Sequence, residues 1–111
     1  SNPYADKLRR GLGGTSKSSL MDRLLLASMI ERRSCERFEM LAEKARQPEL
    51  RELYSSLAPE ELVHQRLFLN LAESECGVEE SQARLAVLID LESTVAAQVP
   101  FANRMHGGQK L

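Results

Sequence analysis

A single glutamate, Glu31, lies at the centre of an otherwise apolar helical stripe and constrains this chain more than any other feature. An α-helix turns by about 100° per residue, so residues three, four and seven positions apart share a face. Such a stripe faces a core, and a carboxylate buried there without a partner is costly. The residues that share the face of Glu31 are small or apolar: Leu20, Leu24, Ala27, Ser28, Ser34, Cys35, Phe38, Ala42 and Ala45.

A second stripe, centred on Glu61, supplies the partners. The residue before a proline is disfavoured in a helix, so we expect a turn near Gln47-Pro48. Glu31 lies about sixteen residues before this turn, and Glu61 and His64 follow it by about fourteen and seventeen, which at about 1.5 Å per residue places all three at one level. The face of Glu61 also carries Leu50, Tyr54, Leu57, His64, Phe68 and Ala72.

One Glu on the first helix and Glu-x-x-His on the second are typical of a metal site. Iron and manganese accept carboxylate oxygen together with imidazole nitrogen, and residues i and i+3 are neighbours on a helix. The sequence therefore predicts that Glu31, Glu61 and His64 bind a metal ion. The alternatives are a buried Glu–His hydrogen bond, or a slightly rotated helix that leaves these groups at the rim. Glu36 is the runner-up ligand, although it lies roughly 140° away from the stripe.

The length predicts one small domain over residues 1–111, and its helical patterns, with no strand pattern, predict an all-α fold. The chain is 42% hydrophobic with three Phe and two Tyr, and its net charge of −1 gives no general attraction to nucleic acid or membrane. No apolar run approaches a membrane span of about 20 residues. Two cysteines form neither a zinc pattern nor a disulfide framework, so we expect Cys35 to be a reduced core thiol and the protein to be cytoplasmic.

Capping and breaking residues predict three long helices. We expect the first from a cap at Ser18 or Ser19 to about Arg46, with Asp22 in its first turn. The second spans about Glu49 to Glu75, stops at Gly77, and contains Pro59 as either a kink or a tolerated surface proline. Further expectations are a short basic helix over residues 3–11, and a third long helix over about 79–98 that faces inward with Leu85, Leu88 and Val95.

Several segments together resemble the second half of the tRNA-(2-methylthio-N6-isopentenyl-adenosine) hydroxylases. The most specific is Ile30-Glu31-Arg32-Arg33-Ser34-Cys35-Glu36-Arg37-Phe38, followed by Leu53-Tyr54-Ser55-Ser56-Leu57 and Glu61-x-x-His64. The resemblance continues upstream to Tyr4-Ala5 and downstream to Arg104-Met105-His106-Gly107. Leu62-Val63 stand where the family has Ala-Arg, so an arginine usual beside the site is absent.

The resemblance implies a ferritin-like fold and a di-iron enzyme. Such enzymes use dioxygen and an electron donor to hydroxylate the isopentenyl group of a modified adenosine in tRNA. Glu31, Glu61 and His64 are then the iron ligands of this half, with two iron ions in a complete site and manganese as an alternative metal. The arginines that could contact RNA are Arg32, Arg33, Arg37 and Arg104; for the first three, a solvated face is the alternative interpretation.

The chain holds only half of a two-metal ligand set. Di-iron carboxylate bundles use two Glu and two Glu-x-x-His pairs, and Glu61-x-x-His64 is the only such pair in the sequence. Either a second copy completes a four-helix bundle as a homodimer, or an N-terminal half is missing. The competing functions are a tRNA hydroxylase, a half-length dimeric ferritin-like protein that binds or oxidises metal without acting on tRNA, and a bundle that has lost its metal.

Overall fold

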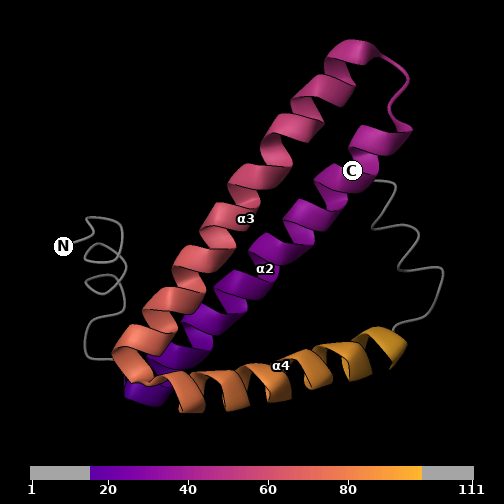
Figure 1. The fold of residues 1–111 in the computed structure, drawn as a ribbon. Coiled ribbons are helices and arrows are strands. Elements are labelled where there is room, and N and C mark those ends of the chain that lie inside the picture. Colours follow the sequence, from indigo (N-terminus) through magenta and orange to yellow (C-terminus); the bar gives the residue numbers. More distant parts are fainter. Residues whose placement is uncertain (1–15, 99–111) are drawn as a thin grey trace.

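The computed structural model describes residues 16–98, which form three helices and no strand. The helices are α2 (Lys17–Lys44), α3 (Pro48–Cys76) and α4 (Val78–Gln98). α2 and α3 lie side by side as a long antiparallel hairpin, whereas α4 leaves the lower end of α3 and runs off to one side (Figure 1). The predicted all-α class is confirmed, and the hairpin is consistent with part of a ferritin-like bundle.

The start of α2 differs from the expectation. Its N-cap is Ser16, in extended backbone, and the Ser16 side chain accepts a hydrogen bond from the Ser19 backbone N–H at 3.3 Å. Ser18 and Ser19 are therefore inside the first turn, and Asp22 lies beyond it. Ser16 is the cap because an N-cap side-chain oxygen accepts a hydrogen bond from the backbone N–H two or three residues onward, and here the Ser16 oxygen reaches the N–H of Ser19. The predicted basic helix over residues 3–11 lies outside the described residues.

The other helix ends follow local backbone chemistry. α2 ends at Lys44, before extended Ala45. Pro48 occupies the first turn of α3, where its missing N–H has no helical partner to lose. Gly77 ends α3 with a φ of 101°, a backbone conformation that side chains with a Cβ rarely adopt. Pro59 is exposed and α3 continues through it.

A small aliphatic core joins the three helices near the lower end of the hairpin. Leu85 and Leu88 face this core as predicted, Leu88 buried and Leu85 packed against it. The expectations for Val95 and Leu50 were wrong: Val95 is 52% exposed because α4 diverges from the hairpin, and Leu50 is 37% exposed near the turn. The buried cluster consists of Leu24, Leu25, Met29, Phe68, Ala72 and Leu88.

Two ion pairs attach α4 to α2. Arg84 donates to both carboxylate oxygens of Asp22, at 2.8 and 3.0 Å, and Arg33 forms an ion pair with Glu92 further along both helices. Charge-assisted bidentate pairs fix orientation as well as distance. These pairs and the core around Leu88 therefore set the direction of α4.

The pair between Asp22 and Arg84 makes the stability of the fold depend on acidity. Its hydrogen bond from Arg84 lowers the pKa of Asp22 below 3.8. A carboxyl group whose pKa is lower in the folded than in the unfolded state stabilises the fold at pH values above its unfolded-state pKa. This stabilisation is lost as the pH falls through the pKa of the folded state. We expect Asp22→Asn to be modestly less stable than the wild type at pH 7 and equally stable in strong acid. Urea unfolding at several pH values measures this; a difference that persists in strong acid would contradict it.

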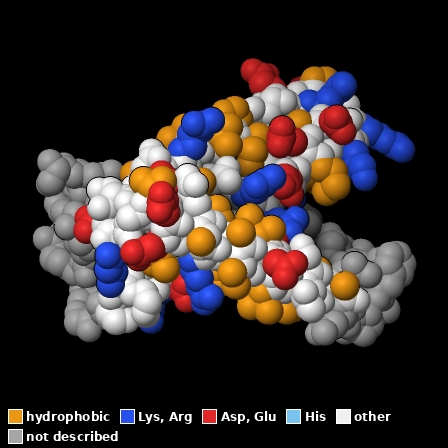
Figure 2. Space-filling model, turned by 60° about the horizontal axis from the view of Figure 1, so that its bottom comes forward, with side chains coloured by type: hydrophobic (Ala, Val, Ile, Leu, Met, Phe, Trp, Pro, Cys, Tyr) orange, Lys and Arg blue, Asp and Glu red, His pale blue; other side chains and the backbone are white. Residues whose placement is uncertain are grey.

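The underside of the molecule carries exposed apolar side chains on α4. Figure 2 shows hydrophobic side chains gathered on this side of the molecule. On α4, Val87, Leu91 and Val95 are each more than half exposed. These side chains are nevertheless interrupted by charges, and none of the described helices has an apolar stretch long enough to cross a bilayer.

Candidate metal centre

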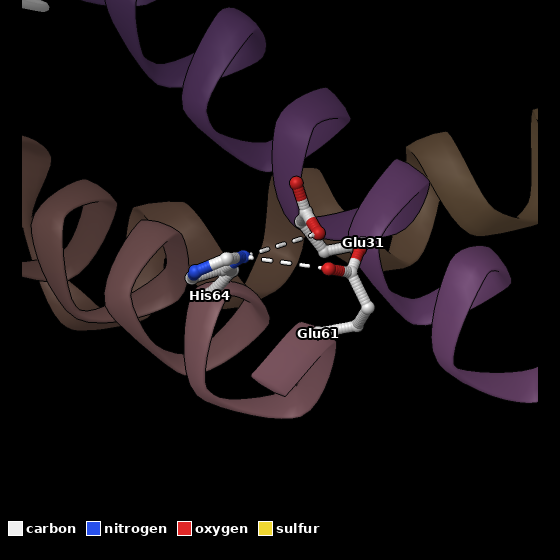
Figure 3. Close-up of side chains that lie close together, drawn as sticks. All are labelled: Glu31, Glu61 and His64. Atoms are coloured by element: carbon white, nitrogen blue, oxygen red, sulfur yellow. Dashed lines mark ion pairs between the residues drawn. The ribbon is translucent and has the colours of Figure 1, made fainter. Parts of the chain in front are cut away.

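The hairpin brings the three predicted ligands together at mid-height. Glu31 comes from the middle of α2, and Glu61 and His64 come from successive turns of α3 (Figure 3). The antiparallel packing aligns their levels, since both helices leave the same turn near Pro48. The shared depth of the three residues, which the sequence predicted from helical geometry, matches the structure.

The three side chains converge on one point. His64 Nδ1 lies 3.6 Å from Glu31 Oε2 and 3.6 Å from Glu61 Oε1. One donor atom from each residue lies within 4.8 Å of the others. The glutamate side chains are about one-fifth exposed, at 22% and 21%, whereas the His64 side chain is 52% exposed. The carboxylates are thus inside the hairpin and the imidazole is at its rim, which corrects the expectation that His64 points fully inward.

Burial and the proximity of the two carboxylates dominate the electrostatics of the cluster. Burial raises the pKa of Glu31, and the nearby Glu61 carboxylate raises it further, while His64 opposes both effects. Glu31 Oε2 is buried and accepts no hydrogen bond from any described residue. A buried polar atom without a partner is unusual in native proteins and invites a functional explanation.

These residues fit a divalent metal ion. Carboxylate oxygen and imidazole nitrogen bind such ions at about 2.0–2.2 Å. The donor atoms lie within 4.8 Å of one another, so small side-chain rotations bring them to a common ion. A cation there would also supply the missing partner of Glu31 Oε2 and neutralise the repulsion from Glu61. The mixed oxygen and nitrogen donors suit iron or manganese.

Glu36, the runner-up ligand, lies elsewhere. It is on the outer surface of α2, where its carboxylate pairs with Arg32 and Arg33, each at 3.4 Å. Among the described residues, the cluster of candidate ligands contains Glu31, Glu61 and His64 but not Glu36. The rotation of Glu36 away from the apolar stripe explains this placement.

The arginines proposed for RNA contact divide into two groups. Arg32 and Arg33 are engaged by Glu36, and Arg33 also by Glu92. Arg37 is exposed and lines a groove of about 670 Å³ between α2 and α4, whose other walls are largely apolar. Arg104 lies outside the described residues.

Cys35 lies next to the candidate metal centre. The sequence predicted it only as a thiol in the core. It is a free, half-buried thiol one turn after Glu31, and it donates a weak hydrogen bond to Glu39 Oε1 at 3.6 Å. Burial, followed by the Glu39 carboxylate, raises its pKa. A thiol held in this protonated form is a poor metal ligand and a poor nucleophile.

Comparison with known proteins identifies the family of this chain. Residues 1–107 match the model of the family described as tRNA-(MS[2]IO[6]A)-hydroxylase (MiaE). Neither the curated proteins nor the solved structures contain a significant match to the chain. The family match covers nearly the whole sequence, including α2, α3 and α4 with the Glu31, Glu61 and His64 cluster. The chain therefore belongs to the MiaE family of tRNA hydroxylases.

Proposed function

We propose that this protein is an iron-dependent tRNA hydroxylase that acts on the isopentenyl group of a modified adenosine. The observation that carries the proposal is the convergence of Glu31, Glu61 and His64 within 4.8 Å in a chain that belongs to this family. Dioxygen and an external electron donor are the other reactants, and a tRNA substrate implies a cytoplasmic location. Manganese is the alternative metal.

The chain's own residues would hold the metal. Glu31 and Glu61 supply carboxylate oxygens, and His64 supplies Nδ1, which faces both acids. Burial and the Glu61 carboxylate raise the pKa of Glu31, and a carboxylate binds metal in its deprotonated form, so metal binding would compete with protons at this group. When bound, iron supplies the redox chemistry by which one oxygen atom of dioxygen enters a C–H bond while two electrons and two protons convert the other to water.

The ligand set needs a second helical hairpin. A complete two-metal centre of this type uses two Glu and two Glu-x-x-His pairs, and this chain supplies one of each. The half-exposed His64 lies at the rim from which such a hairpin would approach. We therefore propose two iron ions in the complete assembly.

Enzymatic activity can be tested directly on tRNA. The full chain, loaded anaerobically with ferrous iron, is mixed with tRNA that carries the isopentenyl adenosine, a chemical reductant and dioxygen. We expect nucleoside mass spectrometry to find a product heavier by one oxygen atom, and none without iron. Iron oxidation without any change in the nucleoside would instead support a ferritin-like metal-oxidising protein.

Among the described arginines, Arg37 is the strongest candidate for a phosphate contact. Arg32 and Arg33 already have carboxylate partners, so they have less to gain from RNA. We expect Arg37→Ala to weaken tRNA binding and to reduce the salt dependence of the binding constant by about one counterion. The matched control is Arg66→Ala, which removes the same charge from an exposed site on α3. Equal effects of the two variants in a salt titration would argue against a specific role for Arg37.

A further inference from the structure

Two aromatic rings contact each other across the hairpin, between the candidate metal centre and the turn at Pro48. Phe38 follows Glu31 by seven residues and Tyr54 precedes Glu61 by seven, so the antiparallel packing brings both rings to one level. The ring centroids lie 6.2 Å apart and the ring planes differ by 19°, which is a stacked arrangement. We call this pair the aromatic layer.

A matching layer lies on the opposite side of the centre, towards α4. Leu24 precedes Glu31 by seven residues and Phe68 follows Glu61 by seven, and both belong to the buried core. Seven residues of helix span about 10 Å. The two acids are therefore the middle layer of one seam between α2 and α3, with an apolar layer about 10 Å away on each side.

The two flanking layers differ in how much protein surrounds them. Leu24 and Phe68 are 2% and 5% exposed. Towards the turn, none of the residues 30–57 is buried, and Phe38 and Tyr54 are themselves half-buried. On this side of the centre the hairpin has no buried core within the described part of the chain. The spacing of its helices there depends correspondingly more on the contact between the two rings.

The spacing of the helices matters at this level because two acids share the middle layer. Carboxylate oxygens of Glu31 and Glu61 each lie 3.6 Å from Nδ1 of His64, and two charged carboxylates this close repel each other. Apolar contact on one side alone would let the helices open at the acids, whereas contact on both sides resists opening. Functional groups act together only when the surrounding packing holds them close to their productive geometry.

We infer that Phe38 and Tyr54 are positioning residues of the metal centre, which hold α2 and α3 at the spacing at which Glu31 and Glu61 share one ion. Neither ring is a ligand, because each lies two helical turns from the acid on its own helix. Their effect is therefore on the affinity of the centre for metal. The inference rests on the metal binding in the proposed function and not on the hydroxylation of tRNA.

Manganese binding by the full chain tests this role without an enzymatic assay. We expect Tyr54→Leu to raise the dissociation constant for manganese by about 10-fold, the lower end of the losses caused by removing groups that orient metal ligands. Tyr54→Phe keeps the ring and should bind manganese like the wild type. Isothermal titration calorimetry measures all three affinities. Affinity unchanged in Tyr54→Leu, or equally reduced in Tyr54→Phe, would overturn the inference.

A double variant tests whether the two rings act as one unit. Phe38→Leu breaks the same stack, so it should weaken manganese binding about as much as Tyr54→Leu does. Because either change removes the whole contact, the variant that carries both should bind no more weakly than either single variant. Losses that multiply in the double variant would overturn the stack as the positioning contact.

Leu88→Ala is the matched control for a general loss of stability. Leu88 is 7% exposed and joins α4 to the core, so this variant loses buried contacts without changing the aromatic layer. We expect it to bind manganese like the wild type, with far-UV circular dichroism verifying that every variant is folded. An equal loss of affinity in Leu88→Ala and Tyr54→Leu would overturn the inference, because stability and not position would then explain both.

The behaviour of the wild type separates this inference from the proposed function. A wild type that binds manganese no more tightly than Tyr54→Leu would refute the positioning role and leave the metal function standing. A wild type that binds neither manganese nor ferrous iron would refute the metal function and the positioning role with it. The expected order of affinities in a chain that does not hydroxylate tRNA would support the positioning role and contradict only the hydroxylase.

Discussion

The His64→Ala variant is expected to lose its iron while remaining folded. His64 provides the only nitrogen donor of the described cluster, and its removal leaves two carboxylates that repel each other. Loss of an outer-shell partner of a metal ligand already costs about 10–100-fold in affinity, so loss of the ligand itself should exceed this range. Because the His64 side chain is 52% exposed, the fold should change in stability by less than about 0.5 kcal/mol. Metal analysis and circular dichroism measure the two effects.

Glu36→Gln is the control for this result. Glu36 is exposed and pairs only with Arg32 and Arg33 among the contacts the structure describes, so the variant should retain its iron. Glu31→Gln should behave like His64→Ala, because it replaces a charged carboxylate ligand by a neutral amide. Iron content unchanged by His64→Ala would refute the centre. Iron lost in Glu36→Gln but kept in Glu31→Gln would identify Glu36 as the ligand.

The Leu25→Ala variant is expected to be the most destabilised of all these variants. Leu25 is 1% exposed and lies in the cluster that joins the hairpin to α4. Truncating a buried leucine removes apolar contacts and leaves a cavity, which costs about 2–5 kcal/mol of unfolding free energy. For a small domain this is a large part of the total stability. Urea unfolding at one fixed protein concentration measures it, since dimerisation would make stability concentration-dependent.

The neighbouring residue supplies a matched control. Leu26 has the same side chain but is 45% exposed, so Leu26→Ala should change the unfolding free energy by less than about 0.5 kcal/mol. Equal destabilisation by the two variants would mean that the core is not organised as the structure has it.

The helices and the position of the cluster could be predicted from local features of the sequence. Proline and glycine act through their own backbone restrictions, so Pro48 and Gly77 predicted the two breaks. Helical periodicity is equally local, and for that reason residue spacing alone could place Glu31, Glu61 and His64 on facing sides at one height. The cap was predicted at Ser18 or Ser19 instead of Ser16 because neighbouring serines offer the same chemistry.

The depth at which each group is buried and the pairing of the charges depend on how the helices pack, and the sequence did not reveal them. The direction of α4 depends on the distant pairs of Asp22 with Arg84 and Arg33 with Glu92, which no local pattern indicates. This direction leaves Val95 exposed although its spacing resembles that of Leu88. Among the described residues, His64 likewise stays half exposed at the rim of the hairpin. Helix periodicity specifies which residues share a face, but the packing of one helix against another decides whether that face is covered.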